Sequence, residues 1–200
     1  MAKTSAVAIC NYALSLLGEN SIISLDDDSK PASLCKVMYP QVRDATIEAH
    51  NWSFAIRWFN LPKATAQSDG PLANRFPMPP EILRVIFVGA DAHHTEEYQI
   101  EGEDIVTNSQ ACVVKAVTLI EDTFKFSSLF SQALSAKLAA ELAVPIAASA
   151  SLSQQMYQLY GVKIQEAVTR DQIQGTSSRI TAKWINRGRF TGTRFAGPTV

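Results

Sequence analysis

The sequence predicts an α+β fold that is mainly helical, and three observations carry this prediction. Apolar residues recur with helical spacing near both ends of the chain, whereas apolar and polar residues alternate in short runs within residues 51–120. The chain has 200 residues, of which 46% are hydrophobic and 18% charged, as is typical of a globular domain with one core. We therefore expect a bundle of about four helices, an inserted small antiparallel sheet and an extended C-terminal tail.

Two helices are predicted in the N-terminal quarter of the chain. Residues 4–17 carry apolar side chains on one face, and Gly18 is placed to end this helix. Residues 30–49 follow Ser29, whose hydroxyl can cap the start of the second helix. Pro40 lies inside the second helix and should bend it, because proline removes one hydrogen bond and clashes with the preceding turn.

The strand-rich insertion is predicted from residue 51 to residue 120. Residues 51–58 alternate aromatic or aliphatic side chains with smaller or polar ones, which indicates a half-buried strand. Residues 62–80 contain five prolines and predict a long surface loop. Short strands on either side of Gly102 predict a hairpin, and residues 111–120 complete a small antiparallel sheet.

Two more helices and a basic tail follow the insertion. Residues 128–143 have helical periodicity and are expected to end before Pro145, and residues 152–172 form the fourth helix. Five of the 18 Lys and Arg residues lie in residues 175–200, which hold no acidic residue, so this tail carries +5 and the rest of the chain −6. We therefore divide the chain into one domain, residues 1–174, and an extended basic tail.

The tail is the candidate binding segment. Trp184 stands between cations, and Trp and Arg are the residues most enriched at binding hot spots. Two alternatives remain open: Trp184 and Ile185 can pack back on the chain's own body, or the cations can hold nucleic acid weakly and without sequence preference. The residues that we expect to contact a partner are Arg179, Lys183, Trp184, Ile185, Arg187, Arg189, Phe190 and Arg194.

The sequence carries no catalytic, cofactor-binding or metal-binding signature. It has no glycine-rich phosphate loop, no dinucleotide fingerprint and no nucleophile elbow. His93 and His94 are metal-binding residue types, but neighbouring side chains point apart and no third ligand has a recognisable spacing. We therefore expect a protein that is not an enzyme, with no cofactor and no metal, and we expect these histidines in a solvated loop.

Other polar or reactive residues have simple structural interpretations. His50 stands where the second helix gives way to a strand, and it can cap the last helical carbonyls. The aspartates at residues 26–28 lack the spacing of a calcium loop and predict an exposed connector. Residues 136–152, the longest weakly polar run, hold two charges and a proline, so no membrane span is expected. The cysteines form no C-x-x-C pair, which predicts buried thiols in a reducing compartment: Cys10, Cys35 and Cys112.

The order and spacing of several short segments resemble a known family, the head-to-tail adaptors of short-tailed phages, also called tail tubular protein A. The resemblance covers about residues 9–172, and its individual motifs are diffuse. Where the family usually has an Asp-bearing variant before its Arg-Val pair, this chain has Pro80-Glu81. The segments that carry it are Ala13 to Glu19, Ser24 to Asp26, His50 to Ala55, Pro79 to Val85, Tyr98 to Thr107 and Leu134 to Pro145.

The resemblance implies a structural virion protein of the phage tail, assembled in the cytoplasm of a bacterial host. It implies a dodecameric ring between the portal and the tail nozzle, through which the genome DNA passes without specific binding, and no membrane partner. We expect the tail, residues 175–200, to dock on the portal, and residues 51–120, with the loop at 62–80, to face the nozzle.

Two other functions remain as alternatives to the adaptor. A virion-associated hydrolase of cell-wall glycans would need paired carboxylates across a cleft. The candidate carboxylates are Glu96, Glu97, Glu101, Glu103 and Asp104. A non-specific nucleic-acid-binding protein would use the basic tail, although no recognised nucleic-acid motif accompanies it.

Overall fold

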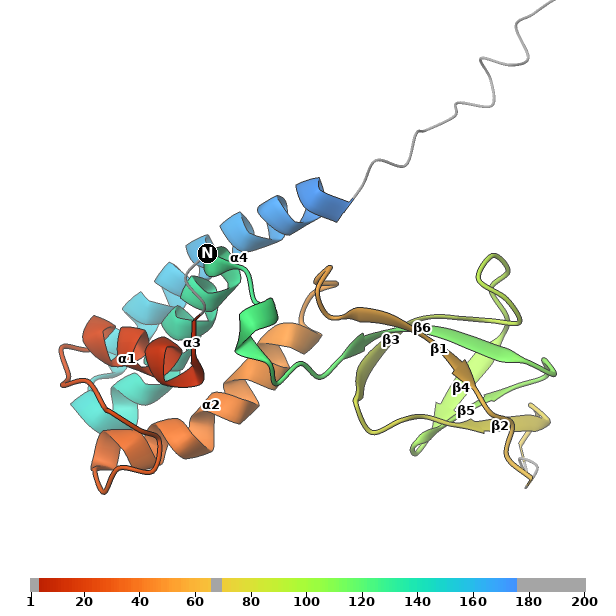
Figure 1. The fold of residues 1–200 in the computed structure, drawn as a ribbon, viewed down its shortest axis with the longest axis horizontal. Coiled ribbons are helices and arrows are strands. Elements are labelled where there is room, and N and C mark those ends of the chain that lie inside the picture. Colours follow the sequence, from red (N-terminus) through yellow and green to blue (C-terminus); the bar gives the residue numbers. More distant parts are fainter. Residues whose placement is uncertain (1–3, 66–69, 176–200) are drawn as a thin grey trace, which may run out of the picture.

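The fold is elongated, with the helices at one end and the strands at the other (Figure 1). The structure is a computed structural model that describes residues 4–65 and 70–175. The predicted class, α+β and mainly α, is confirmed. The helices are α1 (Ala6–Leu16), α2 (Lys30–Glu48), α3 (Ser128–Ala147) and α4 (Ala150–Gly175), with a short 3-10 helix η1 (Thr123–Lys125) before α3.

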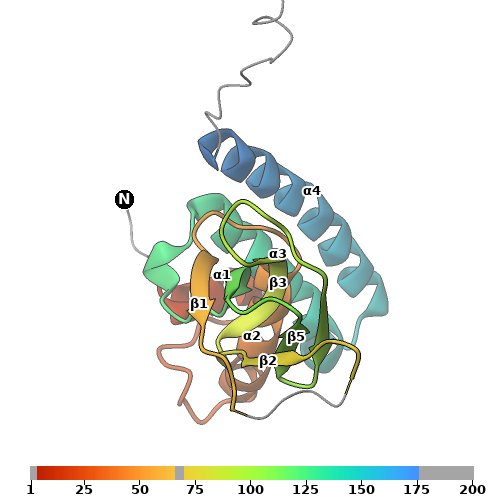
Figure 2. The same ribbon diagram turned by 90° about the vertical axis from the view of Figure 1, so that its right-hand side faces the viewer.

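The strands form two three-stranded antiparallel sheets, whereas the sequence predicted one. The strands are β1 (Ile56–Leu61), β2 (Asn74–Pro77), β3 (Ile82–Gly89), β4 (Tyr98–Glu101), β5 (Asp104–Thr107) and β6 (Cys112–Thr118). The first sheet has the order β1-β6-β3 and the second the order β2-β5-β4. The division arises because β6 pairs with β1 and β3 instead of continuing the hairpin of β4 and β5. Figure 2 looks along the molecule from the strand end, with the helices behind.

Serine caps begin three of the helices, and the one at Ser29 was predicted from the sequence. Ser5 Oγ accepts a hydrogen bond from Ala8 N at 3.1 Å, and Ser29 Oγ accepts one from Ala32 N at 3.3 Å. Before α3, the Ser127 hydroxyl does the same for the third helical residue. These bonds satisfy N–H groups that the helix itself leaves unpaired. Because the cap and its donor are only three residues apart, the start of a helix can be predicted from a short stretch of sequence.

The end of α3 differs from the prediction. The helix passes through Pro145 and ends at Ala147, because a proline in the last turn removes only one hydrogen bond. Ala148 then adopts a left-handed conformation with φ of 49°, and its N–H donates to Val144 O at 3.0 Å. The helix therefore ends at an alanine in the left-handed conformation, a position that glycine usually occupies because it adopts positive φ more easily.

Two strand predictions are wrong in detail. The strand predicted at residues 51–58 begins only at Ile56, because Trp52 turns into the helical core and its Nε1 donates to Thr46 O at 3.0 Å. The predicted loop at residues 62–80 contains β2, whose Phe76 is fully buried. The hairpin between β4 and β5 is confirmed, with Gly102 at φ of 64° in its turn.

The molecule has two hydrophobic cores. The larger lies among the helices, where α3 packs against α1, α2 and α4, and the smaller lies between the two sheets. Neighbouring residues of β6 serve both, since Val117 belongs to the helical core and Ala116 to the sheet core. By length and composition α3 could cross a membrane, but 61% of its most apolar stretch is buried inside the structure, as expected of a core helix.

Candidate functional site

The binding residues predicted in the tail all lie outside the described residues. They are Arg179, Lys183, Trp184, Ile185, Arg187, Arg189, Phe190 and Arg194. The described chain ends with α4 at Gly175, and Figure 1 shows that this end of α4 extends beyond α3 toward the strand end of the molecule. The surfaces near this end are therefore the described part of the candidate site.

A polar cleft lies where α4 meets the turn between α2 and β1. The Asp171 carboxylate accepts hydrogen bonds from Ser53 Oγ at 2.6 Å and from Ser53 N at 3.0 Å. These bonds join two segments that are 118 residues apart in the sequence. The cleft has a volume of about 390 Å³. Its lining residues are His50, Asn51, Ser53, Ile56, Lys115, Asp171 and Gln172.

His50 packs in the wall of this cleft, where the sequence predicted a helix-capping residue. Its ring contacts the edge of Trp52 with centroids 4.9 Å apart, and Trp52 N donates to the His50 carbonyl. Burial lowers the pKa of His50, and the nearby Asp171 carboxylate opposes part of that shift. The carbonyl of Glu48, at the end of α2, accepts instead from Arg84 Nε at 2.9 Å.

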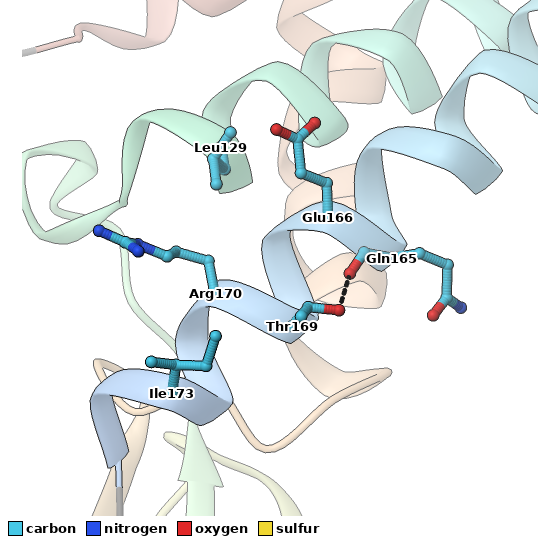
Figure 3. Close-up of a pocket in the computed structure, with 6 residues that line it drawn as sticks. All are labelled: Leu129, Gln165, Glu166, Thr169, Arg170 and Ile173. Carbon is cyan, nitrogen blue, oxygen red and sulfur yellow. Dashed lines mark hydrogen bonds between the residues drawn. The ribbon is translucent and has the colours of Figure 1, made fainter.

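A more apolar groove lies beside the second half of α4 (Figure 3). In Figure 3 the Glu166 and Arg170 side chains extend toward the side of α3, whereas Gln165 points away. Thr169 Oγ1 donates to the Gln165 carbonyl within the helix. The groove has a volume of about 560 Å³, and 68% of Ile173 is exposed. It offers an open apolar contact surface with one charge of each sign.

The outward face of the first sheet carries an aromatic cluster with a cation. Trp58 and Phe87 stand on either side of Lys115 in register, and their ring centroids are 5.6 Å apart. Lys115 Nζ lies 5.6 Å from the centroid of the Trp58 ring, within the range of a cation–π contact. Trp58 nevertheless keeps 49% of its surface exposed. The cluster is therefore an exposed aromatic surface that also carries a positive charge.

The acidic hairpin is organised around one arginine. Arg75 on β2 contacts Glu101 Oε2 at 3.1 Å and Asp104 Oδ2 at 2.9 Å. The guanidinium thus bridges two of the carboxylates that a hydrolase would need, and it holds them at the two ends of one turn. Such an ion pair stabilises the hairpin, and no pattern in the sequence indicated that Arg75 would occupy this place.

The histidine loop is exposed, as predicted. His94 Nδ1 lies 3.0 Å from the Asp91 carboxylate, which raises the pKa of His94 and lowers that of Asp91 to about 2. Among residues 4–65 and 70–175, no three His, Cys, Asp or Glu side chains gather as a metal site.

The cysteines are buried and reduced. Burial raises the pKa of the Cys112 thiol to about 11, and the neighbouring Cys35 raises that of Cys10. A raised pKa makes Cys10 and Cys112 poor nucleophiles, because the reactive form is the thiolate.

Comparison with known proteins leaves the family open: no family model matches the chain, and no curated protein sequence matches it. The adaptor expectation therefore depends on the sequence segments that carry the resemblance.

Proposed function

We propose that the protein is a structural adaptor of a short phage tail, which forms a ring between the portal and the tail nozzle and lets the genome pass. The observation that carries the proposal is the lengthwise arrangement of the molecule, with a helical bundle at one end and a strand-rich insertion at the other (Figure 1). A helical bundle with a small sheet is the fold that the resemblance to the adaptor family implies. A fold alone supports many functions, so the order of the sequence segments is the second support.

In this proposal the tail and the sheets meet different neighbours. The basic tail follows α4 in the sequence and would dock on the portal, with Trp184, Ile185 and Phe190 as apolar anchors. The sheets would face the nozzle, and copies of the chain would join side by side into a closed ring through heterologous contacts. Repetition around the ring would turn weak docking by each tail into strong overall binding.

The proposal is tested by native mass, measured by light scattering, of the protein alone and mixed with a purified portal ring of the same virus. We expect the full chain to add about one subunit per portal subunit. A variant truncated after Gly175 is the matched control, and we expect it to remain unbound, because it lacks all five tail cations.

If neither form binds the portal and no ring appears, the proposal is wrong. Binding to DNA through five phosphate contacts alone weakens steeply as the salt concentration rises. DNA binding that persists at about 0.3 M salt would therefore be more than weak electrostatic attraction, and it would favour the nucleic-acid alternative. Glycan cleavage that is lost in Glu101→Ala and Glu103→Ala variants would favour the hydrolase alternative.

A further inference from the structure

The two sheets have four edge strands, and the chain covers two of these edges itself. Thr95 bridges to Gly89 at the edge of β3, and Glu96 N donates to Val88 O there at 3.1 Å. At the edge of β2, Ala64 N donates to Arg75 O at 2.8 Å. Within the described residues, β1 pairs only with β6 and β4 only with β5. In the described part of the chain, the outer edges of β1 and β4 are therefore the two that remain open to another strand.

The hydrogen-bond pattern shows which residues of β1 face outward. Thr118 N donates to Ala55 O, so the N–H of Thr118 points toward the strand of β1, whereas Ala55 N donates to Trp52 O. Because antiparallel pairs alternate, the backbone groups of Trp58 and Asn60 point away from β6. The N–H of Ile56 also points outward, and it is already bonded to Trp52 O.

The same reasoning applies to β4. Met78 N donates to Glu103 O, which places the backbone of Ile105 toward β2 and that of Asp104 toward β4. Asp104 therefore exchanges bonds with Glu101, and the backbone groups of Tyr98 and Ile100 point away from β5.

The two open edges are complementary in charge and in apolar surface. Arg57 and Lys63 are exposed on or just after β1, with Lys115 beside them, whereas β4 is flanked by acidic side chains. These are Glu96, Glu97, Glu101 and Glu103. Each edge also has one large apolar side chain exposed at an outward-facing position, Trp58 at 49% and Ile100 at 51%.

We propose that β1 of one copy of this protein pairs antiparallel with β4 of the next copy, with Trp58 opposite Ile100. This register places Asn60 opposite Tyr98 and Arg57 opposite Glu101, whose carboxylate also contacts Arg75 of its own copy. It therefore joins the two exposed apolar side chains and brings a further cation to the acidic edge. Trp58 and Asn60 each exchange two backbone hydrogen bonds with their partners. Pro62 limits the ladder at its other end, since proline has no N–H to donate.

A contact between two different edges is heterologous, and repetition of such a contact generates a ring when the rotation closes. The inference rests on the ring of the proposed function and names the surface through which copies join. A second copy is the occupant because the chain itself supplies both complementary edges.

The test is disulfide trapping between two full-length variants, Arg57→Cys and Glu101→Cys, mixed in equal amounts and oxidised mildly. The native cysteines are buried, so the new thiols report the contact. We expect a covalent heterodimer at a yield at least tenfold above that of Arg57→Cys mixed with Glu103→Cys, which lies two residues out of register. A yield no greater than this control would overturn the inference. So would an equal yield of homodimer from Arg57→Cys alone, which would mean that two β1 edges pair.

A matched pair of substitutions tests the backbone contact itself. Asn60→Pro removes an outward N–H that β6 does not use, and proline is tolerated at such edge positions. Introduced beside Arg57→Cys, it should lower the heterodimer yield at least tenfold, whereas Asn60→Ala should change it less than twofold. If thermal unfolding shows that Asn60→Pro does not fold, Ile100→Lys beside Glu101→Cys replaces it, because it sets a cation against Lys115 and Trp58. An undiminished yield in the folded variant contradicts the pairing.

The trapping and the portal measurement fail separately. If the protein adds to the portal ring but Arg57→Cys and Glu101→Cys do not cross-link, the strand pairing is wrong and the adaptor proposal stands. If they cross-link but no portal is bound, the pairing stands and the adaptor proposal is wrong.

Discussion

The removal of the Phe130 ring should destabilise the helical core more than any substitution at its surface. Phe130 is fully buried at the start of α3, and its ring lies against three others. Its centroid is 4.8 Å from that of Phe126, 4.9 Å from that of Trp52 and 5.1 Å from that of Phe54. Truncation of a buried Phe to Ala costs about 3–5 kcal/mol, and the three aromatic contacts favour the upper part of that range. We expect Phe130→Ala to lose about 4 kcal/mol, a large share of the ~5–15 kcal/mol of a typical domain.

Urea unfolding followed by far-UV circular dichroism measures this loss directly. Phe124→Ala is the control, because 58% of Phe124 is exposed, and it should cost less than about 1 kcal/mol. For a chain of this size, the loss from Phe130→Ala should lower Tm by roughly 8–16 °C. If Phe130→Ala costs no more than Phe124→Ala, the aromatic cluster does not hold α3 against the turn before β1, and the reasoning fails.

Three smaller predictions concern a helix end, a histidine and the thiols. Ala148→Gly should raise the free energy of unfolding by about 0.5–1 kcal/mol, because it relieves the left-handed alanine at φ of 49°; a loss in urea unfolding would contradict this. The NMR titration midpoint of His94 should lie above 6.5 and fall toward that value in Asp91→Asn. The ion pair should stabilise the fold below pH 6.5 and lose this effect as pH rises through the raised pKa of His94. On the acid side, its effect should fade as pH drops below 3.8 toward the Asp91 pKa of about 2. No native thiol should react with an aromatic disulfide reagent until denaturant is added, and fast reaction would refute the burial of Cys10, Cys35 or Cys112.

The helices could be predicted from the sequence because their signals are local. Ser29 caps a helix within three residues of its own position, and the apolar spacing that follows is legible in a short window. The strands were harder to predict from the sequence. Trp52 and Trp58 looked equivalent in an alternating run, but Trp52 is anchored by a hydrogen bond to Thr46 in the preceding helix and Trp58 lies on an exposed sheet face. Only the contact between Trp52 and Thr46, which the folded structure creates, distinguishes the environments of the two tryptophans.

The candidate surfaces were less predictable than the fold. Nothing around Ser53 indicates that Asp171 would meet it, because the two residues approach only after both ends of the chain have folded. Arg75 likewise gained its role from β2, a strand hidden in a proline-rich segment that predicted a loop. The tail, by contrast, could be recognised from the sequence by its charge alone, because residues 175–200 hold five cations and no acidic residue.

The pairing of β1 with β6 has a consequence for how the helical bundle assembles. Ile56 and Val117 are partners in that ladder, so the insertion begins and ends at one place. Helices α2 and α3 are separated by about 80 residues, yet once the insertion has folded they behave as if joined by a linker of about 20. That shortening amounts to two halvings of loop length, or roughly 1.2 kcal/mol of closure entropy. The folded insertion therefore holds the end of α2 near the start of α3. A chain in which the insertion cannot fold should also be slow to bring these two helices together.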